Sequence, residues 1–193
     1  MLEEKIKDYL KEHLSERRYN HTLGVCQSAI ELAKLYGEDI ERAKIAALIH
    51  DMAKEMPIKD QKEILEANGF KITEDEENSP QILHGFVASI LGKDIFNITD
   101  EEILSAVYYH STGKREMTRL EKIVYLADYI EPGRIYPGVD ELRELSKKSL
   151  NEGVLMGLNN TIKLIIDNRG VIHPLTLEAR NYLIINLKNG SLS

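Results

Sequence analysis

Cysteine and long apolar runs are scarce in this sequence, and each scarcity excludes a class of protein. The 193 residues include a single cysteine, Cys26, so no disulfide can form within the chain. We therefore expect a reducing, cytoplasmic setting. No apolar run approaches the roughly 20 residues that cross a bilayer, and residues 1–18 are charged throughout, unlike a secretory signal or an anchor. No membrane partner is expected.

Positive charge is also in deficit. The chain has 25 Lys and Arg residues against 32 Asp and Glu, a formal net charge of −7. A surface of this sign suits a nucleic-acid backbone poorly, so we expect no nucleic-acid polymer as a partner. A small phosphate compound stays compatible with it, because a bound metal and a few basic side chains can reverse the sign inside a pocket.

The alternation typical of strands is absent, and no internal repeat or linker is visible. Apolar residues instead recur at helical spacing, which predicts an all-α helical bundle forming a single domain over residues 1–193. Predicted helices cover residues 3–14, 20–36, 39–53, 58–67, one opening at Ser79-Pro80, 99–110, 118–130, 140–167 with a break near 151–153, and 175–187. Residues 71–78 are the most polar segment and are predicted to be a mobile loop.

Local signals predict where several helices begin and end. Thr99-x-x-Glu102 and Thr118-x-x-Glu121 are capping-box patterns. Gly37 and the pair Asn68-Gly69 are typical helix ends.

Four of the six histidines and two aspartates lie within or at the ends of apolar helical segments; they are His21, His50, His84, His110, Asp51 and Asp128. The adjacent pair His50-Asp51 ends the apolar run 45–49. Burying both side chains is costly without strong partners, and a divalent cation would serve both. A helix end that reaches solvent explains the pair equally well. For Asp128, inside the apolar segment 123–130, the alternative is a partner Arg or Tyr.

The order His21, His50-Asp51, Asp128 resembles the H…HD…D signature of the HD-domain superfamily of metal phosphohydrolases. Further segments are similar to its YqeK-type family, which cleaves diadenosine tetraphosphate symmetrically; they are residues 18–21, 48–54, 83–85, 109–113, 122–134 and 168–181. The resemblance covers nearly the whole chain. Ser111 departs from the expected Thr but keeps the hydroxyl.

The candidate metal ligands are His21, His50, Asp51, His84, His110 and Asp128. His21, His50, Asp51 and Asp128 can hold one ion and leave positions open for water and substrate. His84 and His110 suit a second ion with Asp51 as the bridge, although they can also serve as phosphate contacts alone. The resemblance likewise implies two divalent ions, with iron as the first expectation; imidazole and carboxylate ligands also suit Mn, Zn, Ni and Co.

The resemblance implies attack by a metal-activated water on the polyphosphate, with Asp51, Lys54, His84 and His110 as the catalytic set. The candidate substrate-binding residues are Arg18, Lys54, Ser111, Thr112, Gly113 and Arg134. Arg134 is expected to clamp phosphate, and the turn 111–113 is expected to offer free backbone N–H groups. Residues 136–139 are candidates for a base pocket, and Arg169 and His173 fit either a family motif or a structural role. The sequence is compatible with a homodimer.

Three other functions stay open at this point. One is a different HD nucleotide phosphohydrolase, such as a nucleotidase or cyclic phosphodiesterase. Another is a di-iron oxygenase on an HD-like scaffold, since the same ligands suit oxygen chemistry. The last is a metal or nucleotide sensor without turnover. Lys54, Arg134 and the polar turn after His110 favour phosphate chemistry.

Overall fold

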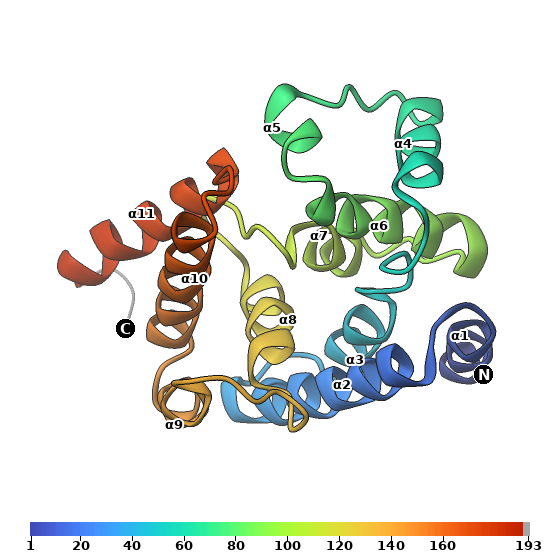
Figure 1. Ribbon diagram of the computed structural model, residues 1–193. Coiled ribbons are helices and arrows are strands. Elements are labelled where there is room, and N and C mark those ends of the chain that lie inside the picture. The colour runs from blue at the N-terminus through green and yellow to red at the C-terminus, as the bar shows by residue number, and fades with distance from the viewer. Residues whose placement is uncertain (191–193) are drawn as a thin grey trace.

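The computed structural model describes residues 1–190, and within them every regular element is a helix, which confirms the all-α prediction (Figure 1). The elements are α1 (Leu2–His13), α2 (Glu16–Tyr36), α3 (Ile40–Ile49), α4 (Ile58–Ala67), α5 (Glu74–Glu77), η1 (Pro80–Ile82), α6 (Leu83–Phe96), α7 (Glu101–Tyr109), α8 (Arg119–Ile130), α9 (Val139–Lys148), α10 (Leu150–Asp167) and α11 (Pro174–Lys188). No helix in this part of the chain is long and apolar enough to cross a membrane. The single-domain organisation stays a prediction.

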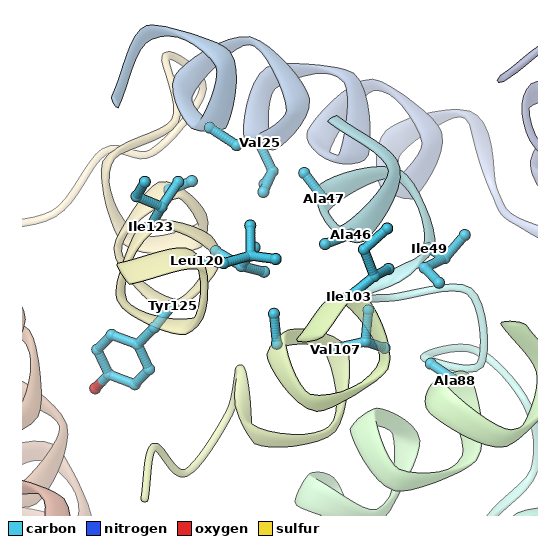
Figure 2. Packing of buried hydrophobic residues seen from close by; sticks show 14 of the residues in the cluster. Val25, Ala46, Ala47, Ile49, Ala88, Ile103, Val107, Leu120, Ile123 and Tyr125 are labelled. Atoms are coloured by element: carbon cyan, nitrogen blue, oxygen red, sulfur yellow. The ribbon is translucent and has the colours of Figure 1, made fainter. Parts of the chain in front are cut away.

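Four helices meet at the centre of the core. Helix α2 packs on α3 and α8, and α7 packs on α3 and α8 from the other side. Figure 2 shows Val25 of α2, Ala47 of α3 and Leu120 of α8 pointing into the space between these helices, and all three are buried. Small residues on α3 let its neighbours approach closely. This packing of four helices brings the C-terminal ends of α3, α7 and α8 close to one another.

Several predicted boundaries are confirmed. Helix α2 ends at Gly37, whose φ of 67° is the left-handed conformation that glycine adopts without strain. Thr118 caps α8, accepting a hydrogen bond from the Glu121 N–H, and the Glu121 carboxylate accepts from the Thr118 N–H. The capping box at this position is therefore present as predicted.

The helix predicted over residues 39–53 is shorter than expected. It ends at Ile49, and residues 50–56 form successive turns. The cause is local: Nδ1 of His50 lies 2.5 Å from the Ala47 carbonyl oxygen, which a continuing helix would offer to the Asp51 N–H. His50 and Asp51 are thus turned away from the helix and toward the middle of the molecule.

Two predictions about residues 71–102 are wrong. Residues 71–78 are not a loop throughout, because Thr73 and Glu76 form a capping box that starts the short helix α5. Helix α7 is capped by Asp100 rather than Thr99; the Asp100 carboxylate accepts hydrogen bonds from the N–H groups of Glu102 and Ile103. A carboxylate is a strong cap and it stands one residue nearer to the helix.

Two further boundaries shift. The break expected near residues 151–153 lies at Ser149, whose extended backbone and side-chain cap on the Glu152 N–H separate α9 from α10. Ser79 does not cap the element that follows it. Its hydroxyl donates to the carbonyl oxygen of Val171 instead, and residues 80–82 form a short 3-10 turn before α6.

Candidate metal centre

The structure brings all six candidate metal ligands together. His21 lies in α2, His84 in the first turn of α6 and Asp128 in the last turn of α8. His50 and Asp51 follow the end of α3, and His110 follows the end of α7. The site therefore forms where the ends of four helices, α3, α6, α7 and α8, meet the side of α2.

Asp51 is at the centre of this cluster. Its Oδ1 lies 2.9 Å from Nε2 of His84 and 3.7 Å from Nε2 of His110. Its Oδ2 lies 3.7 Å from Nε2 of both His21 and His50. Each carboxylate oxygen thus faces its own pair of imidazoles. Two groups that could each hold an ion share Asp51, and within each group the ligand atoms lie within 4.8 Å of one another.

Hydrogen bonds fix the orientation of all four imidazoles through Nδ1. The partners are the carbonyl oxygens of Ala47 for His50, Gln81 for His84 and Val107 for His110, at 2.5–2.7 Å, and the carboxylate of Glu131 for His21, at 3.1 Å. Each of these acceptors requires a proton on Nδ1, so the lone pair is left on Nε2. The Nε2 atoms are those that face Asp51.

Two of these nitrogen atoms are buried without a hydrogen-bond partner among the described residues, Nε2 of His21 and Nε2 of His50. Nε2 of His21 lies 3.0 Å from Oδ1 of Asp128, but without hydrogen-bond geometry. Buried polar atoms are rarely left unpaired. The cluster of imidazole nitrogens and carboxylate oxygens fits a divalent ion of the Fe, Mn, Zn, Ni or Co type.

The ionisation of the cluster also suits ligation. Burial lowers the pKa of His50 and of His84 to about 4, so both are neutral near pH 7. Burial alone would raise the pKa of Asp51, but the imidazoles of His50 and His110 outweigh it and hold that pKa well below its ordinary value. Neutral His50 and His84 beside the ionised Asp51 are in the form that binds a cation, whereas for His21 the contacts with Asp128 and Glu131 outweigh burial and raise the pKa.

Three basic side chains reach the cluster. Nη1 of Arg18 donates to Oδ2 of Asp51 at 2.7 Å. Arg134 pairs with the Asp128 carboxylate, and its Nε donates to the Asp128 carbonyl oxygen at 2.8 Å. Asp128 thus has the arginine partner that was the alternative explanation for it, and it also lies beside His21. Nζ of Lys54 is 3.3 Å from Nε2 of His84, and burial lowers the pKa of this lysine.

The polar turn after His110 is only partly in the site. Oγ of Ser111 lies 3.1 Å from Nε2 of His110. Thr112 is buried, and its hydroxyl donates to the carbonyl oxygen of Gly113. The N–H group of Gly113 donates to the Tyr109 carbonyl oxygen at 2.7 Å, so the prediction that it is free for a phosphate is wrong. The hydroxyl of Thr112 and the N–H group of Gly113 are thus both engaged by the turn itself.

Two basic residues shortly after this turn, and His173, have partners of their own. Nζ of Lys114 pairs with the buried Glu121 at 2.7 Å, and Arg115 stacks over the ring of Tyr182. His173 caps α11. These contacts give the three side chains structural partners elsewhere in the fold.

Two cavities flank the ligand cluster and share Arg134 and Tyr136. The first has a volume of about 920 Å³ and is lined by residues of α2 and of the loop after α8, among them Arg18, His21 and Glu131. The second has a volume of about 650 Å³ and is lined by residues of α8, α10 and the same loop, among them Asp128 and Lys163. Tyr136 and Pro137, two of the base-pocket candidates, line this second cavity.

Reasoning from the sequence gave no role to Glu131. This residue is buried, and its Oε1 lies 3.1 Å from Nδ1 of His21. It lies inside the segment 122–134 that carries the resemblance. The local sequence around a carboxylate after a helix end does not indicate which distant residue it contacts. Gly24 was also missed: a Cβ atom there would lie 2.5 Å from Oε2 of Glu131.

The chain is similar to known proteins over most of its length. Residues 18–133 match the HD domain family. A Bacillus subtilis protein named bis(5'-nucleosyl)-tetraphosphatase, symmetrical, is 39% identical over 91% of this chain and 94% of its own length. A Halalkalibacterium halodurans protein of the same name is 39% identical over 93% of the chain and 95% of its own length. A crystal structure from Clostridium acetobutylicum, described as that of a predicted HD superfamily hydrolase involved in NAD metabolism, has 47% identity and a TM-score of 0.93, covering 95% of this chain and 97% of that chain.

Proposed function

The chain belongs to the HD-domain family, and from this premise we propose that it hydrolyses diadenosine tetraphosphate symmetrically to two ADP. The observation that carries the proposal is the pair of ligand groups that share Asp51, flanked by two cavities. Relatives with 39% identity over nearly the whole chain bear the name of this activity.

We propose that two divalent ions occupy the site and that these ions are iron. His21, His50, Asp51 and Asp128 would hold one, and Asp51, His84 and His110 the other. When bound, such ions supply an activated water and neutralise charge on phosphate oxygens. The remaining tasks fall to the side chains around them.

Arg134 is the residue best placed to bind the phosphate chain. It lines both cavities and adjoins Asp128. Its planar guanidinium can pair with two phosphate oxygens at once. A substrate with a nucleoside at each end can place one end in each cavity while its phosphates pass Arg134. This binding mode places the middle of the phosphate chain beside the metal ligands and favours symmetrical cleavage.

Lys54 and Arg18 complete the phosphate site from the other side. Both contact ligand residues, Lys54 at His84 and Arg18 at Asp51. Burial lowers the pKa of Lys54, yet Asp51 and Asp128 favour its charged form. The positive charges of Lys54 and Arg18 offset the negative charge that develops on the departing ADP. Ser111 stands close enough to His110 to orient a water or a phosphate oxygen there.

The test is the identity of the products. Purified protein with Fe(II) or Mn(II) and diadenosine tetraphosphate should give ADP alone on ion-exchange chromatography. Diadenosine pentaphosphate should give ADP and ATP, because attack falls two phosphates from one end. AMP with ATP from the tetraphosphate, or no turnover in the metal-loaded protein, would sink the proposal. A competition screen with mononucleotides and cyclic nucleotides separates this activity from that of other HD phosphohydrolases.

A further inference from the structure

Glu131 lies behind His21, on the side away from Asp51. Of the four imidazoles in the cluster, His21 has a carboxylate at Nδ1, whereas the other three have backbone carbonyl oxygens. Hydrogen bonds to a charged acceptor are roughly twice as strong as those to a neutral one. A carboxylate behind a metal-ligating imidazole fixes the ring and raises its basicity. His21 therefore differs from its neighbours as a ligand.

The carboxylate of Glu131 is itself held in place. Its Oε2 accepts a hydrogen bond from the N–H of Gly133 at 2.6 Å, while Oε1 faces His21. Arg143 of α9 fixes the surrounding backbone: it donates to the carbonyl oxygens of Ile130 at 3.0 Å, Glu131 at 2.8 Å and Arg134 at 2.9 Å. Because both carboxylate oxygens and the backbone of Glu131 are hydrogen-bonded, the carboxylate is restricted to one orientation.

Helix α2 leaves space for this carboxylate. Gly24 follows His21 by three residues, so both lie on the same face of α2. A Cβ atom at Gly24 would come within 2.5 Å of Oε2 of Glu131. Glycine inside a helix is unfavourable relative to alanine. Its presence here is explained by the close approach of Glu131.

We infer that Glu131 is a positioning residue for His21, and that through it the ion held by His21, His50, Asp51 and Asp128 is bound more tightly than the ion held by Asp51, His84 and His110. The inference rests on the proposed metal centre but not on the proposed substrate. Asp128 gives the first ion an additional ligand, and the partner at Nδ1 adds to the difference: a fixed carboxylate for His21 against a neutral carbonyl for His84 and His110. The two ions should therefore leave the protein in separate steps.

The experiment follows metal content rather than turnover. Protein loaded with Mn(II) is equilibrated with increasing concentrations of a chelator, and metal per chain is measured by mass spectrometry. Glu131→Gln keeps the size of the side chain and an acceptor for His21 but removes the charge. We expect the more tightly held ion to dissociate about 10- to 100-fold more readily in this variant, with the other ion unchanged. Equal metal retention in the variant and the unaltered protein would overturn the inference.

A double-mutant comparison separates positioning from general structural support. His84→Gln leaves only the ligand group that contains His21, and in this background E131Q should still weaken metal binding about 10- to 100-fold. In a His21→Gln background E131Q should have no further effect on the remaining ion, because Glu131 then has no ligand to orient. Weakening of equal size in both backgrounds would mean that Glu131 only supports the fold.

Two further variants control for the loop. Arg143→Gln removes the guanidinium that restrains residues 130–134 but leaves the carboxylate of Glu131 beside His21, so metal release should change less than in E131Q. Gly24→Ala displaces the carboxylate without changing any charge and should reproduce the E131Q effect. Loss of metal in R143Q as large as in E131Q would assign the effect to loop order and overturn the inference. Absence of diadenosine tetraphosphate cleavage would not alter these readings, since none of them depends on substrate.

Discussion

The Oδ1 atom of Asp51 lies 2.9 Å from Nε2 of His84, while the other oxygen of the same carboxylate faces His21 and His50. A single side chain thus connects two halves of the cluster that come from different helices. Because the backbone turns at His50, the carboxylate points to the middle of the site rather than along α3. The position of Asp51 is the feature on which the two-ion proposal depends most.

Replacing Asp51 with Asn should nearly abolish activity. The amide keeps the size of the side chain but removes the charge shared by both ligand groups. We expect kcat/KM for diadenosine tetraphosphate to fall by at least about 1000-fold, because several kcal/mol of charge stabilisation are lost. Metal content should also fall. The matched control is Asp94→Asn, an exposed aspartate of α6; D51N protein with a tenth or more of the original activity would contradict the bridging role.

Arg134→Lys tests the phosphate clamp while conserving charge. Lysine cannot make the planar paired contact that a guanidinium makes with two phosphate oxygens. Loss of one charged hydrogen bond costs about 1.5–3 kcal/mol, so kcat/KM should fall about 10- to 100-fold. Arg115→Lys is the control, since Arg115 stacks on Tyr182 away from the cluster. Steady-state kinetics measure kcat/KM for both variants. A kcat/KM value for R134K equal to that of R115K would show that Arg134 does not bind the phosphates.

The fold was largely predictable from local pattern. Apolar periodicity and end signals located most helices, as at Gly37 and Thr118. The prediction was wrong where a side chain competed for a backbone group. His50 takes the Ala47 carbonyl oxygen and ends α3 early, and Asp100 takes the cap expected of Thr99. Such competition depends on rotamers that a sequence pattern does not encode.

The candidate site was likewise predictable in part. The candidate ligands were recognisable because buried acids and histidines are costly and because their order resembles a family signature. The contact between His21 and Glu131 was not recognisable, since it joins residues 110 positions apart. Thr112 was placed in the site because it follows His110 closely, yet its hydroxyl donates to the carbonyl oxygen of Gly113. Adjacency in sequence gives proximity, but not the direction of a side chain.

Gly113→Ala should affect stability rather than substrate binding. Gly113 has a φ of 67°, and a Cβ atom there would lie 3.1 Å from Cβ of Ala179 and 3.3 Å from Sδ of Met117. We expect the free energy of unfolding to fall by about 1–3 kcal/mol from backbone strain and overpacking. Gly69→Ala is the matched control, because Gly69 has a φ of 78° and open space around it. Urea unfolding measures both; a raised KM in G113A with undiminished stability would restore its predicted role in binding.

The metal-free protein should lose stability as the pH falls from about 6.5 to about 4. Burial lowers the pKa of His50 and of His84 from 6.5 to about 4. Between these values the unfolded chain binds more protons than the folded one, so acid favours unfolding. The contribution is complete above pH 6.5 and amounts to roughly 3 kcal/mol for each histidine. His21 does not offset it, because its pKa is raised and its contribution is lost only as the pH rises above 6.5.

Urea unfolding of chelator-treated protein at a series of pH values measures this dependence. In His84→Gln one of the two titrating groups is gone, so the slope of the unfolding free energy against pH should fall by about one proton at pH 5 to 6. His13→Gln, at an exposed position outside the cluster, is the control for replacing a histidine by glutamine. Because the slope counts protons, it is insensitive to a uniform loss of stability in either variant. An unchanged slope in H84Q would show that His84 is protonated in the folded, metal-free protein, and that its burial does not keep it neutral for ligation.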